Sequence, residues 1–226
     1  MKREIVATAD GSTTIQLVDW NEQYHSMHGA IQEARHVFLK TGLDHWRTKN
    51  AEKKEIHILE IGFGTGLNAL LTAMHLDQKD STTHYKGVEA YPVAPEEIDQ
   101  LNYVDQLDQP DYAAFFRRMH DCPWSEESAL SSHFYLYKLK ERFENLKEKD
   151  NTCDLIFFDA FGAQVQPELW DVVIFKKMYN TLKVGGILVT YSAKGSVRRA
   201  MQEVGFTVER LPGPPGKREM LRAVKG

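Results

Sequence analysis

The sequence has few cysteines and no long apolar run. Its two cysteines, Cys122 and Cys153, follow neither a metal-binding nor a redox spacing, which predicts free thiols in a reducing compartment. No apolar stretch approaches the 18 residues of a membrane-spanning helix, and the first residues, MKREIVATADG, lack the apolar core of a secretory signal. We therefore expect a cytoplasmic protein without a membrane partner.

The chain also lacks a strong net charge, but its charges are unevenly distributed. The net charge is −4; residues 1–150 hold 17 Lys and Arg against 25 Asp and Glu, whereas residues 171–226 hold 11 against 4. These counts give −8 for the first segment and +7 for the second. A basic end on an acidic body is compatible with RNA binding, although solvated helix faces would produce the same asymmetry.

The hydrophobic pattern predicts an α/β fold. Residues 4–19 alternate around an Asp-Gly turn, which predicts a β-hairpin, and residues 29–43 predict a helix that ends near Gly42. Beyond residue 56, strands alternate with helices. The predicted strands are 56–61, 84–90, 133–139, 154–159, 186–192, 206–211 and 218–224, and the predicted helices are 66–77, 94–119, 168–182 and 195–204.

This alternation is typical of a mainly parallel sheet covered on both faces. The linker PGPPGK before the last strand is too short for a parallel crossover, so we expect that strand to be antiparallel. We predict a seven-stranded sheet with residues 1–50 as an N-terminal extension and residues 51–226 as the main domain. At 226 residues, the chain is long enough for this arrangement.

A glycine-rich loop follows the first strand of this sheet, in HILEIGFGTGLNALL. The strand ends near Glu60, and Gly62, Gly64 and Gly66 open a helix, where glycine lets the backbone turn tightly and approach a ligand. Leu67 occupies the third glycine position of a dinucleotide fingerprint, which disfavours a nicotinamide cofactor. The spacing G-x-G-x-G, with Glu60 two residues before it, is the form associated with S-adenosylmethionine. Such loops also occur as plain structural corners.

Two further acids end predicted strands. Glu89 closes HYKGVE, more than 20 residues past the glycines, where a carboxylate can accept both hydroxyls of a ribose. Asp159 follows the apolar run LIFF, at the sheet edge where open α/β sheets bind ligands. An unpaired carboxylate in such a place is costly, so Asp159 is expected either to act in the site or to cap the turn that follows.

Five segments carry a resemblance to a known family. They are YHSMHGAIQEARHVFL, ILEIGFGTGLNALL, DLIFFDAFGAQVQPELW, SAKGSVRRAMQEVGF and GKREMLRA. With them the chain resembles, from about residue 20 onward, the MnmC-like tRNA wobble-uridine methyltransferases, in the stand-alone form called MnmD. The resemblance implies a Rossmann-like class I methyltransferase fold. It also implies methyl transfer from S-adenosylmethionine to 5-aminomethyluridine in the tRNA anticodon loop, giving 5-methylaminomethyluridine.

The resemblance also implies roles for single residues. Asp159 would orient the amine and accept its proton. For this chain we expect no FAD, no metal ion and no obligate protein partner. The implied cofactor-binding residues are Glu60, Gly62, Gly64, Gly66, Asn68 and Glu89, and the implied substrate-binding residues are Tyr24, Ser26, Phe161, Trp170, Lys217 and Arg218. For Trp170, core packing is an equal alternative. The Gly-Asp pair that the family often shows near the adenine is replaced by Leu139 and Lys140, so the adenine contacts stay open.

Two other functions compete with this one. A small-molecule amine methyltransferase or aminopropyltransferase would use a similar sheet, a similar cofactor and an acid near the amine. A non-catalytic module that binds S-adenosylmethionine or RNA would not need Asp159. Lys217 and Arg218 favour RNA, because a basic pair on the terminal hairpin can hold anticodon phosphates.

Overall fold

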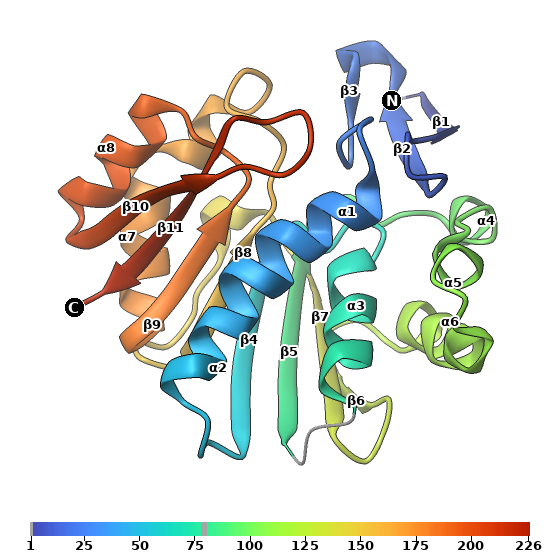
Figure 1. Ribbon diagram of the computed structural model, residues 1–226, viewed down its shortest axis with the longest axis horizontal. Helices are drawn as coiled ribbons and strands as arrows, with labels where there is room; N and C mark the ends of the chain where they lie inside the picture. Colours follow the sequence, from blue (N-terminus) through green and yellow to red (C-terminus); the bar gives the residue numbers. More distant parts are fainter. Residues whose placement is uncertain (1, 78–80) are drawn as a thin grey trace.

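The protein is built around one eight-stranded sheet (Figure 1), seen in a computed structural model that describes residues 2–77 and 81–226. The strand order is β10-β11-β9-β8-β4-β5-β7-β6. The strands are β4 (Glu55–Ile61), β5 (Thr82–Glu89), β6 (Glu127–Ala129), β7 (Phe134–Lys140), β8 (Cys153–Phe158), β9 (Leu182–Thr190), β10 (Phe206–Pro212) and β11 (Glu219–Lys225). Neighbours among β7, β5, β4, β8 and β9 pair in parallel, so their carboxyl ends share one edge of the sheet.

All seven predicted strands are present, and the predicted direction of the last one is confirmed. β11 runs antiparallel to both β10 and β9. The predicted number of strands is wrong, because β6 adds an eighth at the edge, antiparallel to β7. β6 consists of Glu127, Ser128 and Ala129, and three residues without an apolar pattern give no strand signal.

One long helix crosses the face of the sheet that Figure 1 turns to the viewer. It comprises α1 (Ala30–Ala34), a wide π-helical segment (Arg35–Asp44) and α2 (His45–Lys49). The predicted end near Gly42 is therefore wrong. Gly42 is buried inside the helix, where an added Cβ would lie 2.9 Å from Cγ2 of Val189. Its small size lets the helix approach β9 closely.

Further helices complete the two layers. α3 (Leu67–Leu76) lies beside the long helix, and α7 (Val172–Thr181) and α8 (Gly195–Glu203) cover the opposite face. Asp171 caps α7 through a hydrogen bond from the Ile174 amide, 2.9 Å long. None of the helices in the described residues is long and apolar enough to cross a membrane.

The predicted helix over residues 94–119 is interrupted. It is divided into α4 (Pro95–Ile98), α5 (Tyr103–Gln106) and α6 (Ala113–Asp121), with a 3-10 turn at Pro110–Tyr112 before α6. Asp108 adopts a left-handed φ of 52°, and Pro110 follows two residues later. Both features are incompatible with a continuous helix.

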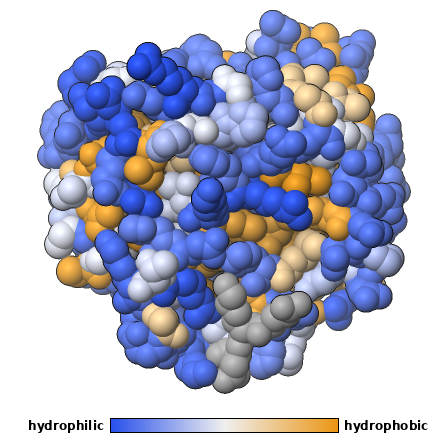
Figure 2. Space-filling model, in the orientation of Figure 1, coloured by the Kyte–Doolittle hydropathy of each residue, from blue (hydrophilic) through white to orange (hydrophobic). Residues whose placement is uncertain are grey.

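A small antiparallel sheet stands beyond the carboxyl ends of the parallel strands (Figure 1). It contains β1 (Arg3–Ala7), β2 (Thr13–Leu17) and the two-residue β3 (Glu22–Gln23). The predicted hairpin is confirmed by the pairing of β1 with β2, in which Ile5 lies opposite Ile15. The visible face of the molecule is mostly hydrophilic, and apolar side chains show over this small sheet at the upper right (Figure 2).

Candidate active site

A cavity of about 1060 Å³ opens at the carboxyl ends of the parallel strands. It lies between the small N-terminal sheet, the glycine loop, the segments after β5, β7 and β8, and the loop that precedes β11. Of the residues predicted for the site, Tyr24, Ser26, Gly62, Gly64, Asn68, Glu89, Asp159, Phe161 and Lys217 line it. Glu60, Gly66, Trp170 and Arg218 are not among the lining residues.

The glycine loop between β4 and α3 makes a cradle at the floor of the cavity. Gly62 and Gly64 have φ angles of 93° and 49°, in the left-handed region that favours glycine. A Cβ on Gly62 would lie 2.5 Å from the backbone oxygen of Asp159, and one on Gly64 would lie 3.0 Å from Cδ1 of Tyr24. These positions therefore need glycine for both conformation and space, and the Gly62 amide is held by a hydrogen bond of 3.0 Å to the Val88 carbonyl.

Glu89 lies at the end of β5 and faces this cradle. Its Oε2 accepts a hydrogen bond of 3.0 Å from the Gly64 amide, and its Oε1 accepts one of 2.9 Å from the Tyr91 amide. Burial raises the pKa of the Glu89 carboxyl. Each oxygen has a further lone pair, so the side chain fits the predicted role of a ribose acceptor.

Asn68 links two other acids beneath the cavity. Its Nδ2 donates to Oε1 of Glu60 at 2.8 Å and to Oδ2 of Asp159 at 2.9 Å. Glu60 is fully buried and also accepts from the Tyr85 hydroxyl, and burial raises its pKa well above the usual range. Among the described residues, the buried Oδ1 of Asn68 has no hydrogen-bond partner, which leaves an acceptor for a donor from a bound molecule.

Asp159 follows β8 and exposes part of its side chain to the cavity. Its removal from bulk water raises the pKa of the carboxyl to about 7, and the negative charge of Glu33 acts in the same direction. The Asn68 hydrogen bond and the Lys217 charge oppose that shift. In the described part of the chain, the hydrogen bond to this carboxylate comes from Asn68 and not from the turn amides of residues 160–164.

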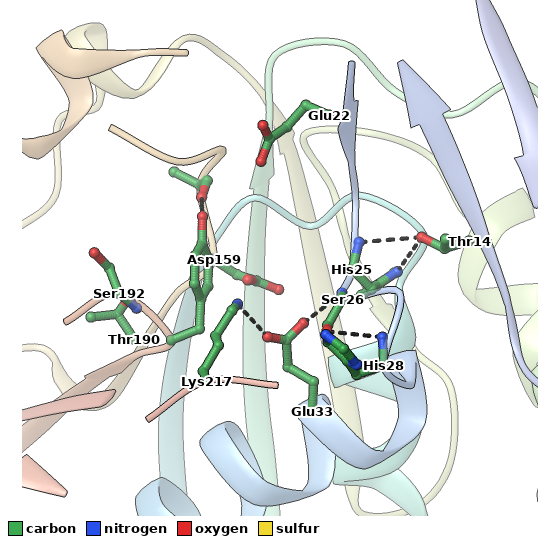
Figure 3. Close-up of polar contacts among 12 residues, drawn as sticks. Thr14, Glu22, His25, Ser26, His28, Glu33, Asp159, Thr190, Ser192 and Lys217 are labelled. Atoms are coloured by element: carbon green, nitrogen blue, oxygen red, sulfur yellow. Dashed lines mark hydrogen bonds and ion pairs between the residues drawn. The ribbon is translucent and has the colours of Figure 1, made fainter. Parts of the chain in front are cut away.

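Lys217 reaches into the cavity from the loop before β11 (Figure 3). Its Nζ lies 2.5 Å from Oε1 of Glu33 and 3.9 Å from the centre of the Tyr191 ring. The other Glu33 oxygen accepts a hydrogen bond of 2.8 Å from the Ser26 amide. Arg218, by contrast, is exposed and is not among the lining residues, so the predicted basic pair is divided between the cavity and the surface.

Sequence reasoning missed Glu33. The residue lies on α1 and is only 7% exposed, and its carboxylate joins the N-terminal segment to the C-terminal hairpin through Ser26 and Lys217. The available signal was an acidic residue within an otherwise apolar helix face, beside Ala30 and Ala34. Buried carboxylates of this kind are rare unless they are paired.

Tyr24 and Ser26 belong to a segment that is fixed against β2. The Tyr24 amide donates to the Ile15 carbonyl at 2.9 Å, and Nδ1 of His25 lies 2.9 Å from the Thr14 hydroxyl oxygen. Burial lowers the pKa of His25 to about 4, so its imidazole is neutral at physiological pH. These contacts hold the Tyr24 ring over the glycine loop.

Phe161 forms an aromatic wall with Tyr24, since the ring centres lie 5.1 Å apart in an edge-to-face arrangement. Trp170 lies behind this wall and is only 4% exposed. Its Nε1 donates to the Phe161 carbonyl at 2.7 Å, and its ring packs against Phe158 and Phe175. Trp170 therefore packs in the core, and it contacts the site through its hydrogen bond to the Phe161 backbone.

The segment after β7 borders the cavity where the family's Gly-Asp pair is missing. Glu141 accepts hydrogen bonds from the Arg142 amide and from Nδ2 of Asn145, and it does not line the cavity. Arg142, Phe143 and Glu144 do line it. The side chains that this segment presents to the cavity are thus a guanidinium, a phenyl ring and a carboxylate.

Glu55, His57 and His84 form a group of three metal-ligand types at the other end of the strands. Their nearest ligand atoms lie within 4.8 Å of one another. The two imidazole rings are stacked, with centres 4.7 Å apart and planes inclined by 9°. An ion in the plane of one ring would therefore lie outside the plane of the other, so this arrangement would have to change before both histidines bound one ion.

Comparison with known proteins gives the family. Residues 112–226 match the sequence profile of an S-adenosyl-L-methionine-dependent methyltransferase family. The chain is 29% identical over 222 residues to the tRNA 5-methylaminomethyl-2-thiouridine biosynthesis bifunctional protein MnmC of Paracidovorax citrulli, covering 90% of this chain and 33% of that protein. It is 30% identical over 213 residues to MnmC of Leptospira borgpetersenii, covering 89% and 32%. The chain thus spans about a third of the length of these curated relatives.

Solved structures agree with this result. The crystal structure of MNMC2 from Aquifex aeolicus matches all of this chain and 70% of its own, with a TM-score of 0.82 and 26% identity. A probable spermidine synthase from Corynebacterium glutamicum covers 98% of this chain and 76% of its own, at a TM-score of 0.57 and 17% identity, which shows a shared fold alone. With the glycine cradle and the acids in place, the chain belongs to the family of S-adenosyl-L-methionine-dependent methyltransferases.

Proposed function

We propose that the chain transfers a methyl group to the amine of 5-aminomethyluridine at the wobble position of tRNA, in the cytoplasm. The observation that carries this proposal is Asp159, a carboxylate with a pKa of about 7 that faces a cavity next to an aromatic wall. The MnmC relatives are named for the biosynthesis of 5-methylaminomethyl-2-thiouridine in tRNA, which is consistent with an aminomethyluridine substrate.

The cavity floor fits S-adenosylmethionine, the methyl donor of this family. When bound, the cofactor supplies a reactive methyl group on a positively charged sulfur. Gly62 and Gly64 would let the backbone approach the cofactor closely, because neither carries a Cβ and both adopt left-handed φ angles. Glu89 would accept hydrogen bonds from its ribose, and the unpartnered Oδ1 of Asn68 would accept one from its amino group.

Asp159 would prepare the amine of the substrate. A protonated aminomethyl group has no lone pair, so it must lose a proton before its nitrogen can form the new N–C bond. A carboxylate with a pKa of about 7 is half ionised at neutral pH and can accept that proton. Asn68 holds one oxygen of Asp159 at 2.9 Å, which fixes the direction of the carboxylate while its other oxygen remains for the substrate.

The aromatic wall would hold the uracil. Phe161 follows Asp159 by two residues in the chain, and the Tyr24 ring lies against Gly64 of the glycine loop. Enzymes that act on a nucleobase take it out of the stack and hold it between aromatic or apolar side chains. Trp170 would support this wall through its hydrogen bond to the Phe161 carbonyl. The exposed Arg218 would contact a phosphate at the rim.

Residues 1–50 would act as an extension that completes the site on the domain formed by residues 51–226. Arg3, Tyr24 and Glu33 support this division, because each lines a cavity whose floor is formed by the later residues. Arg3 also bonds to the Tyr91 carbonyl at 2.9 Å and to Glu97 at 3.0 Å. The extension is thereby tied to the segment that follows Glu89.

The test is a methyl-transfer assay with purified protein and S-adenosylmethionine. We expect a mass gain of one methyl group on 5-aminomethyluridine in tRNA, detected by mass spectrometry of the nucleosides. Unmodified tRNA is the matched control and should not react. Methylation of a free polyamine, or its aminopropylation when decarboxylated S-adenosylmethionine is supplied as the donor, with no reaction on the modified tRNA, would assign the small-molecule function instead.

A further inference from the structure

Trp20 is a large aromatic side chain at the mouth of the cavity that the proposed chemistry does not use. Its side chain is 39% exposed and lines the same cavity as Asp159. Val18 and Met27, in the same N-terminal region, are also exposed apolar residues, at 38% and 42%. Figure 2 shows apolar side chains over this small sheet. Exposed apolar groups beside a binding cavity mark an interaction surface more often than scattered single residues do.

The Trp20 ring continues the aromatic wall outward. Its centre lies 6.1 Å from that of Phe161, with the two ring planes at 90°, and Phe161 in turn lies 5.1 Å from Tyr24. Among the described residues, no aromatic ring or cation is stacked on the indole; its ring contact is the edge-to-face one with Phe161. Phe161 follows Asp159 by two residues, so one end of the wall is next to the acid in the chain and the other end is the partly exposed Trp20.

The backbone holds Trp20 in a defined position. It ends a single 3-10 turn, Val18–Trp20, which is closed by Asn21 in the left-handed region at φ 49°. The Val18 amide donates to the Lys2 carbonyl at 3.0 Å, and the Lys2 amide donates to Oδ2 of Asp19 at 3.0 Å. The turn is thus tied to the start of β1 on both sides. A partly exposed aromatic ring on such a fixed turn loses little conformational freedom when a ligand stacks on it.

We propose that Trp20 is a stacking platform for an unpaired nucleobase next to the target uridine in the RNA chain. This inference rests on the proposed function, which places a flipped uracil at the inner part of the same aromatic wall. A splayed nucleotide leaves its neighbours unstacked, and single-stranded RNA is held by stacking bases on aromatic side chains. The platform would select an anticodon loop over a free nucleoside, because only the loop carries the neighbouring base.

The experiment uses an anticodon stem-loop with 5-aminomethyluridine at the wobble position. The variants are Trp20→Ala and Trp20→Phe, with Val18→Ala as the matched control from the same turn, since Val18 is equally exposed but does not line the cavity. Loss of one stacked base raises the KM for the stem-loop by about 5- to 150-fold in Trp20→Ala. Trp20→Phe and Val18→Ala should stay near wild type, and kcat and the Kd for S-adenosylmethionine should change by less than about twofold.

Abasic stem-loops provide a second measurement that does not depend on how well a variant folds. With the wild-type protein, an abasic nucleotide on one side of the target should raise KM as much as Trp20→Ala does. With Trp20→Ala, the same abasic stem-loop should show no further loss, because both changes remove one contact. An unchanged KM in Trp20→Ala would overturn the platform alone. So would a loss for the abasic nucleotide that adds fully to the loss for Trp20→Ala, whichever side of the target the abasic nucleotide is on. Wild-type protein inactive on the intact modified stem-loop would overturn the proposed function and the platform with it.

Discussion

Asp154 and Asp159 stand at opposite ends of one strand and have opposite surroundings. Asp154, near the start of β8, is 2% exposed; its Oδ2 accepts from Lys183 Nζ at 2.8 Å and from the His57 amide at 3.0 Å. Lys53 adds a cation 3.6 Å from its Oδ1. Asp159, just past the end of β8, receives a hydrogen bond from Asn68 and has a pKa raised to about 7.

The difference shows that β8 carries a structural acid at one end and a reactive acid at the other. A carboxylate with two cations and an amide donor is compensated for its removal from water, so it can hold neighbouring segments together. A carboxylate with one neutral donor and an open oxygen is left uncompensated. Such a group stays reactive toward a ligand that brings a donor or a proton.

The largest effect is expected for Asp159→Asn, which keeps the shape of the side chain and removes its capacity to accept a proton. Methylation of 5-aminomethyluridine should fall by about 10²- to 10⁴-fold in single-turnover rates. In the wild type, kcat/KM should decline as the pH falls below about 7, because Asp159 becomes protonated. In the variant, the inflection near pH 7 should be lost, and the rate should instead rise at higher pH as the amine itself is deprotonated.

Asp154→Asn is the control for this prediction and should keep single-turnover rates within about threefold of wild type at saturating S-adenosylmethionine. A folded Asp159→Asn protein with near wild-type turnover would show that Asp159 does not act in the reaction. Equal losses in the two variants would show that both acids act through the structure.

The second largest effect tests whether S-adenosylmethionine binds at the carboxyl ends of the strands. Gly64→Val places a branched side chain against Tyr24 at a φ of 49°, so the Kd for S-adenosylmethionine should rise by more than about tenfold. Gly185→Val imposes a similar backbone penalty at φ 76° on β9, where an added Cβ has nothing within 4 Å. Calorimetry should therefore show weaker binding only in the first variant, and equal affinities in both would reject the glycine cradle.

The smallest effect concerns stability and its pH dependence. Asp154→Asn should lower the free energy of unfolding by about 1–3 kcal/mol, because two ammonium groups lose their partner. For Asp159, the expected change in the free energy of unfolding has the opposite sign. Its pKa rises from 3.8 to about 7 on folding, so between these values the folded state binds more protons, and stability falls as the pH rises.

Asp159→Asn should therefore be more stable than wild type at pH 8 by about 1–3 kcal/mol, with little difference at pH 4. Urea unfolding at both pH values measures this change. A variant that is less stable than wild type at pH 8 would indicate that Asp159 supports the turn after β8, as a capping residue would.

Much of the fold and the three acids at the strand ends could be predicted from the sequence. Buried parallel strands give apolar runs such as LIFF, and an acid directly after such a run must lie at the carboxyl edge of the sheet. The same logic placed Glu89, since a strand has a fixed direction. These features depend on local patterns, which is why the sequence indicates them.

Features that depend on distant contacts could not be predicted. Glu33 and Lys217 form an ion pair across 184 positions, and nothing near either residue indicates the other. Gly42 has the appearance of a helix end, yet the helix continues because Val189, far along the chain, requires a small residue there. Trp170 was equally consistent with a site and with the core, because a single tryptophan after a turn carries no periodicity.

The ion pair between Glu33 and Lys217 also has a consequence for the order in which the protein matures. Gly216, next to Lys217, is so close to His28 that an added Cβ would meet the imidazole ring, so the segment before α1 and the loop before β11 meet at the cavity that Asp159 lines. During synthesis the helix that carries Glu33 emerges early, but its partner comes 184 positions later. A nascent chain can therefore build most of the sheet while its cavity still lacks one wall. The wall that Lys217 supplies can be added only after the loop before β11 has been synthesised.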